Sequence, residues 1–238
     1  MENVYFIFIK NQRNQRNQRK IMQQNQTQTQ NIVILISGRG SNMEAIVQSW
    51  QHQMFPQNTK IAAVISNNAD AAGLNFAKQH NIATEVLSHK NFASRQEYDQ
   101  SLIKIIDKYT PKLVVLAGFM RILSPEFVQH YQQRLMNIHP SLLPSLTGLH
   151  THKRAIESGL KIHGCTVHFV TAELDAGPII IQGAVPVLPN DNEDILAARV
   201  LKIEHKIYSK AIQLFLQGKI NANSDSNNQN ADEFLIAF

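Results

Sequence analysis

The sequence predicts an α/β fold, in which helices cover both faces of a mostly parallel, twisted β-sheet. Between residues 31 and 138, short continuous apolar runs alternate with amphipathic segments of helical period. After residue 160, two strand patterns follow one another with a short turn between them, which predicts antiparallel strands near the C-terminal part. A long amphipathic helix then closes the domain, so the expected arrangement is Rossmann-like.

The first half of this pattern contains three strands, each followed by a helix. In chain order we expect a strand at 32–36, a helix from residue 42, a strand at 61–65, a helix at 71–80, a strand at 84–87 and a helix at 95–109. The helix from residue 42 carries its apolar side chains at helical spacing, so one of its faces should pack on the sheet.

The second half adds strands with fewer helices between them. In chain order we expect a strand at 113–117, a helix, strands at 135–138, 166–170 and 179–187, and a helix at 193–216. The first of these helices begins at Ser124-Pro125, because serine caps helix N termini and proline fits the first helical position. The closing helix carries one stripe toward the core, formed by Ile195, Leu196, Arg199, Val200, Ile203 and Ile207.

The two ends of the chain differ in composition from this core. Residues 11–19 repeat Asn-Gln-Arg three times, and residues 221–230 are rich in Asn and Ser. Such segments bury too little apolar surface to offset the entropy lost on ordering. We therefore expect a disordered extension at 1–30, one domain at 31–219 and a flexible tail at 220–238.

Composition excludes several classes of protein. Of the 238 residues 43% are hydrophobic, which is enough for a packed core. No apolar run approaches the ~18 residues of a membrane-spanning helix. The single cysteine, Cys165, excludes an internal disulfide and argues against a Cys-rich zinc site, so a cytoplasmic compartment is expected. The net charge is +5, of which residues 31–220 carry +4; this surplus suits a small anionic substrate as well as a nucleic acid.

Ligands of such sheets bind beyond the carboxyl ends of the strands, so the residues after each buried run are the candidates. After the first strand, residues 37–42 read Ser-Gly-Arg-Gly-Ser-Asn and lead into a helix. The backbone N–H groups of such a turn can hold a phosphate at the positive end of the helix. A tight turn with a serine cap is the other interpretation, since neither a Walker A motif nor the three-glycine dinucleotide fingerprint is present.

Two later strands are also followed by polar residues. After the fourth strand, Arg121 stands among large apolar residues, which suits a flat ligand with a carboxylate, although an arginine that covers the core is the simpler interpretation. After the fifth strand, Asn137 and His139 lie two residues apart, so both side chains point to one face. One of them can donate to an oxyanion while the other transfers protons.

Asp175 lies between the two later strands, in Asp-Ala-Gly-Pro. Beside His139 it would favour the charged imidazole, but an ordinary turn is the alternative interpretation. His150 and His152 are spaced like metal ligands, yet no third ligand stands nearby in the sequence, so we place them in a loop and predict no metal site. We expect structural roles for the remaining histidines considered, namely His163, His168 and His205.

Residues 31 to about 219 resemble the folate-dependent glycinamide ribonucleotide formyltransferases of purine synthesis. The matching segments occur in the family's order, at 36–42, 116–123, 137–144, 148–150, 167–170, 174–178 and 204–208. The resemblance implies that the ribonucleotide phosphate binds Gly40, Ser41 and Asn42, and that Glu204 contacts the same substrate. The folate-binding residues implied are Arg95, Met120, Arg121, Ile122, Leu123, Asn137, Thr171, Ala172, Glu173, Leu174 and Asp175.

The implied reaction is direct transfer of the formyl group from 10-formyltetrahydrofolate to the amine of glycinamide ribonucleotide. Asn137 and protonated His139 would stabilise the oxyanion, and Asp175 would keep His139 charged and position a water that carries the proton. The resemblance implies that no metal, membrane or nucleic acid takes part. It also implies a cis peptide bond at Leu143–Pro144, and the protein is expected to be a monomer or a homodimer.

Related enzymes with the same catalytic core carry additional domains. The formyltransferase of initiator methionyl-tRNA adds a C-terminal RNA-binding domain, and formyltetrahydrofolate hydrolase adds an N-terminal regulatory domain, whereas only short extensions are seen in this sequence. An inactive nucleotide-binding module, or a nucleic-acid-binding protein that uses residues 11–19, are the alternatives outside these enzymes. Residues 145–147, Ser-Leu-Thr, depart from the family's basic or aromatic residue, so no substrate contact is implied there.

Overall fold

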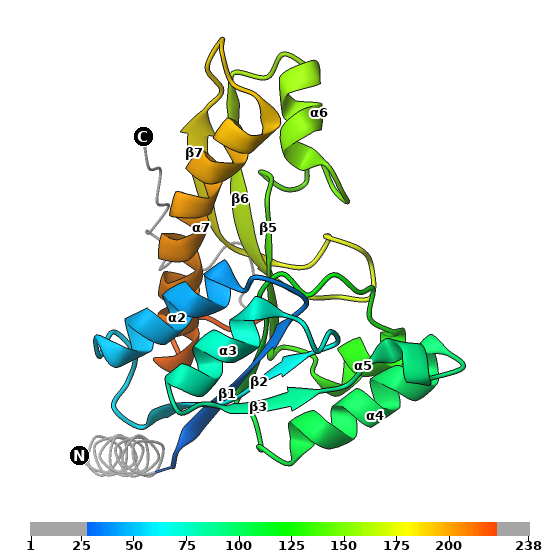
Figure 1. Cartoon of the computed structure of the whole chain (residues 1–238). Coiled ribbons are helices and arrows are strands. Elements are labelled where there is room, and N and C mark those ends of the chain that lie inside the picture. The colour runs from blue at the N-terminus through cyan, green and yellow to red at the C-terminus, as the bar shows by residue number, and fades with distance from the viewer. Residues whose placement is uncertain (1–27, 223–238) are drawn as a thin grey trace, which may run out of the picture.

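The computed structural model describes residues 28–222 of the chain (Figure 1). The elements in chain order are β1 (Gln30–Ile36), α2 (Ser41–Gln51), β2 (Thr59–Ser66), α3 (Ala72–Gln79), β3 (Ala83–Val86), the 3₁₀ turn η1 (His89–Asn91), α4 (Arg95–Asp107), β4 (Leu113–Leu116), α5 (Pro125–His130), β5 (Leu135–His139), α6 (Thr151–Glu157), β6 (Ile162–Phe169), β7 (Ile179–Pro186) and α7 (Glu193–Leu216). The expected extension at 1–30 and tail at 220–238 fall mostly outside the described residues.

One seven-stranded sheet has the order β3-β2-β1-β4-β5-β6-β7. Strands β1 to β5 pair in parallel, whereas β6 runs antiparallel to both β5 and β7. The predicted fold class is therefore confirmed, including the antiparallel strands near the C-terminal part and the closing helix. Among the described residues no helix is both long and apolar enough to cross a membrane.

The sheet separates two hydrophobic cores, because alternate residues of each central strand point to opposite faces. In β1, Ile32, Ile34 and Ile36 belong to the core covered by α2, α3 and α7, whereas Val33 and Leu35 belong to the core covered by α4 and α5. Burial on both faces explains why this strand is a continuous apolar run in the sequence.

The buried stripe of helix α7 differs from the predicted one at the N-terminal end of the helix. Leu196, Val200 and Ile203 are buried, but Ile195 is 47% exposed, so its assignment to the stripe is wrong. The core contacts follow the i, i+4, i+7 spacing, and residue 195 lies to one side of it. On the same side Arg199 binds the carboxylate of Asp191 through both terminal nitrogens, at 2.6 and 2.7 Å.

Two further predictions are corrected by the structure. His152 lies in α6 and not in a loop; this seven-residue helix begins after His150, a left-handed residue without a side-chain cap, and so lacks the usual start signal. The connection between β6 and β7 is not a short turn, since it comprises residues 170–178. This longer connection contains Asp175.

Gly183 of β7 permits α7 to approach the sheet closely. A Cβ at this position would collide with Cγ2 of Ile203 in α7. The branched side chain of Ile203 is stiff, so the clash would be relieved only by moving the helix.

We predict that Gly183→Ala lowers the free energy of unfolding by about 1–3 kcal/mol, as overpacking of a filled core does. Urea unfolding measures the change. In an Ile203→Ala background the same glycine substitution should cost much less, because the clashing atom is absent. An equal cost in both backgrounds would contradict this packing account.

Candidate active site

The loop between β1 and α2 borders a cavity of about 300 Å³ beyond the carboxyl ends of β1 and β4. The lining residues are Ser37, Gly38, Arg39, Gly40, Ser41, Asn42, Ala117, Gly118 and Met120. Gly40 has φ 78°, and a Cβ there would lie 3.2 Å from Cα of Gly73, so both the turn and its packing require glycine. Because α2 begins at Ser41, its unpartnered N–H groups and positive end lie at this cavity.

Two residues implied to bind the ribonucleotide meet beside this loop. Nδ2 of Asn42 donates a hydrogen bond to Oε2 of Glu204 at 2.7 Å, although the residues are 162 positions apart. Burial raises the pKa of Glu204, and the hydrogen bond from Asn42 partly opposes this. Oδ1 of Asn42 is buried without a hydrogen-bond partner among the described residues, so it can accept a hydrogen bond from a ligand or a water.

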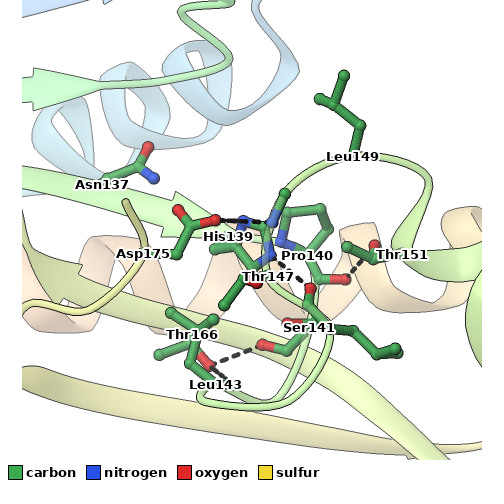
Figure 2. Close-up of polar contacts among 12 residues, drawn as sticks. Asn137, His139, Pro140, Ser141, Leu143, Thr147, Leu149, Thr151, Thr166 and Asp175 are labelled. Carbon is green, nitrogen blue, oxygen red and sulfur yellow. Dashed lines mark hydrogen bonds and ion pairs between the residues drawn. The ribbon is translucent and has the colours of Figure 1, made fainter. Parts of the chain in front are cut away.

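The structure also brings Asp175 to His139. Oδ2 of Asp175 lies 3.5 Å from Nδ1 of His139, and both side chains are 7% exposed. The same oxygen accepts a hydrogen bond from the backbone N–H of Gly148 at 2.9 Å. Figure 2 shows the carboxylate turned toward the imidazole, with Asn137 at the adjacent part of β5.

His139 has an acceptor at each ring nitrogen. Nε2 donates to the carbonyl oxygen of Leu146 at 3.0 Å, and Nδ1 faces Asp175. Two acceptors suit the doubly protonated imidazolium, which has two N–H donors. The Nε2 bond fixes the ring, while the 3.5 Å contact at Nδ1 is longer than the usual N–H···O bond and is therefore weak, so the Nδ1–H can also donate to a ligand.

A residue that the sequence interpretation took as structural orients Asn137. Nδ1 of His168 donates to the carbonyl of Phe169 at 3.0 Å, so Nε2 is the acceptor and receives a hydrogen bond from Nδ2 of Asn137 at 3.3 Å. Burial lowers the pKa of His168, which favours this neutral tautomer. One amide N–H of Asn137 is thereby fixed, and the second is free to meet a ligand. Residues 137 and 168 are paired across β5 and β6, and this pairing, which the sequence pattern does not show, is what brings His168 to Asn137.

Asp175 reaches this position through an unusual backbone. Its φ is 54°, in the left-handed region that residues other than glycine seldom adopt. Aspartate tolerates this region better than most residues, and such conformations cluster at functional sites. The loop 170–178 also folds tightly, because a Cβ on Gly177 would collide with the carbonyl of Phe169.

Several of the residues implied to bind the folate are large, apolar and exposed. Met120, Ile122 and Leu174 are 71%, 61% and 59% exposed, which is unusual for large apolar side chains. The guanidinium of Arg121 lies 4.7 Å from the ring centre of Tyr98, and its buried Nε has no hydrogen-bond partner among the described residues. Of the other implied residues, Leu123 is half-buried, and Arg95, Thr171, Ala172 and Glu173 are exposed.

Comparison with known proteins identifies the family. The protein family described as formyl transferase matches residues 30–212. The chain belongs to the formyl transferase family. It is 52% identical over 196 residues to the phosphoribosylglycinamide formyltransferase of Escherichia coli K12, which covers 82% of this chain and 92% of the relative.

The chain is also similar to part of a longer human protein and to a bacterial protein of known structure. The human trifunctional purine biosynthetic protein adenosine-3 is 44% identical over 189 residues, which are 79% of this chain and 18% of the human protein. The structure of the Coxiella burnetii phosphoribosylglycinamide formyltransferase aligns with a TM-score of 0.77 and 47% identity, over 82% of this chain and 90% of that one. The cis bond at Leu143–Pro144 that the resemblance implied is present.

Two more histidines, one in α6 and one in β6, contact each other. Nδ1 of His152 lies 3.1 Å from Nε2 of His163. Burial lowers the pKa of His152, and it lowers the pKa of His163 to about 4. His168 shifts in the same direction for the same reason.

We predict that the protein loses stability as the pH falls from about 6.5 toward 4. The unfolded chain binds protons at these histidines near the ordinary pKa of about 6.5, whereas the folded chain resists them until lower pH. Urea unfolding at pH 7, 6 and 5 measures the slope. His163→Gln should flatten it, whereas His130→Gln, at a 40% exposed side chain, should not. The same slope in wild type and His163→Gln would contradict this assignment.

Proposed function

We propose that this formyl transferase transfers the formyl group of 10-formyltetrahydrofolate to the amine of glycinamide ribonucleotide. The products would be formylglycinamide ribonucleotide and tetrahydrofolate, in the purine pathway to IMP. The observation that supports this most directly is the contact of His139 with Asp175 beside Asn137, three side chains that come from separate segments of the chain.

The two substrates have separate surfaces that meet at one cavity. The phosphate of the ribonucleotide suits the N–H groups at the start of α2, near Gly40, and Asn42 with Glu204 offers buried polar atoms to the rest of that substrate. The flat pterin suits the exposed apolar side chains of Met120 and Leu174. Met120 also lines the cavity, so the surface proposed for the pterin adjoins the one proposed for the ribonucleotide at this residue.

The chemistry needs donors for a negative charge that develops on the formyl oxygen. The substrate amine attacks the formyl carbon, a C–N bond forms, and the bond from that carbon to N10 breaks. Nδ1–H of His139 and the second amide N–H of Asn137 would donate to the oxygen. Asp175 would balance the charge of His139 and hold a water that moves the amine proton to N10.

This mechanism uses side-chain donors and one water, so it requires no metal ion. The cytoplasm is the compartment that we propose, on the ground that the chain has one cysteine, Cys165, which is buried and free. A monomer or a homodimer is compatible with the mechanism, because all the residues named come from one chain.

We predict that His139→Ala and Asp175→Ala each lower turnover by roughly 10²–10³, the usual effect of removing one oxyanion donor or its support. The absorbance of the folate product measures turnover. The matched control is His130→Ala, which removes a surface imidazole whose Nε2 lies 2.9 Å from Oδ2 of Asp107. Wild-type turnover in a folded His139→Ala variant would refute the catalytic assignment.

A second assay separates transfer from hydrolysis. The wild-type protein is given 10-formyltetrahydrofolate with and without glycinamide ribonucleotide. We expect tetrahydrofolate only when the ribonucleotide is present, because the amine is the nucleophile. Release of tetrahydrofolate at the same rate without the ribonucleotide would instead identify a hydrolase.

A further inference from the structure

Ser37 ties together two loops that the proposed function gives to different substrates. It is the first residue after β1 and opens the phosphate loop at 37–40. Its backbone N–H donates to the carbonyl of Gly118 at 3.2 Å, and its Oγ accepts a hydrogen bond from the backbone N–H of Met120 at 2.8 Å. Both of these partners belong to the segment after β4 that leads into the folate-binding residues.

The hydroxyl of Ser37 is itself held in one orientation. It donates to Oδ1 of Asn67 at 2.6 Å, and Nδ2 of Asn67 lies 3.4 Å from Nδ1 of His89. Asn67 follows β2 and His89 follows β3, so the chain of polar contacts crosses the carboxyl ends of four parallel strands. With its proton committed to Asn67, the oxygen of Ser37 presents lone pairs to the N–H of Met120.

We propose that Ser37 is a positioning residue that fixes the folate-binding segment relative to the phosphate loop. This inference rests on the proposed function, because it assigns one substrate to each loop. Transfer requires the amine nitrogen and the formyl carbon to be held about 3–3.5 Å apart in an aligned geometry, and a misplacement of about 1 Å can cost turnover about 10²-fold. The hydroxyl of Ser37 sets this spacing without contacting either reacting atom.

The test separates positioning from binding and from stability. In Ser37→Ala the Met120 N–H loses its partner, while the backbone bond to Gly118 remains. We expect turnover at saturating substrates to fall about tenfold or more. The dissociation constants of glycinamide ribonucleotide and of tetrahydrofolate, each measured alone by calorimetry, should change less than about threefold, because each loop stays intact.

Three further variants sharpen this test. Ser37→Thr keeps the hydroxyl and should restore most of the turnover. Asn67→Ala frees the hydroxyl and should lower turnover in the same direction, with little added effect in the double variant because the two residues act as one unit. The matched control is Ser49→Ala, which removes the hydroxyl bond to Ser209 between α2 and α7, 2.8 Å long, and should leave turnover unchanged.

Some results would overturn the proposal. Unchanged turnover in a folded Ser37→Ala would do so. A loss of turnover that weaker binding of one substrate fully explains would also overturn it, and so would an equally large loss in Ser49→Ala. If the wild-type protein forms no product with glycinamide ribonucleotide, the proposed function fails first. That result is distinct, because the positioning of Ser37 is judged only against an active wild type.

Discussion

The register of β5 between its neighbours is the constraint on which the site depends. Asn137 pairs with Leu116 at the end of β4 on one side and with His168 of β6 on the other. Strand β5 therefore extends past β4 as far as His139. The antiparallel β6 passes His139 at Thr166 and Asn137 at His168, and the loop 170–178 begins just after it. A slip of one residue would turn Asn137 and His139 into the core, because successive side chains alternate between faces.

The site combines rigid supports with a few groups left for ligands. Asp175 is held by the N–H of Gly148 and by its own left-handed backbone, and His139 is held by the carbonyl of Leu146. The second N–H of Asn137 and the Nδ1–H of His139 are the donors that these bonds do not use up. Preorganised donors of this kind stabilise a developing charge without reorganising during the reaction.

Local patterns were enough to predict the strands and the long helices. A strand buried on both faces requires a continuous apolar run, and a helix buried on one side requires apolar residues at helical spacing. The positions of residues 37–42 and of the Asn137/His139 pair at the carboxyl ends of strands were also predictable, since each directly follows or ends such a run. What spacing could not supply was long-range pairing. The orientation of Asn137 by His168 depends on strand register, the contact of Asn42 with Glu204 spans most of the chain, and α6 lacks a local start signal.

The central claim is that Asp175 and His139 act as one catalytic unit. A double-mutant cycle in kcat/KM, with His139→Ala, Asp175→Ala and the double variant assayed under one set of conditions, tests it most directly. The account predicts that the double variant is hardly slower than the slower single variant, because the charged imidazole and the water held by Asp175 serve the same transition state and the loss of either disables both. Losses that multiply in the double variant would show that the two residues act independently and would contradict the account.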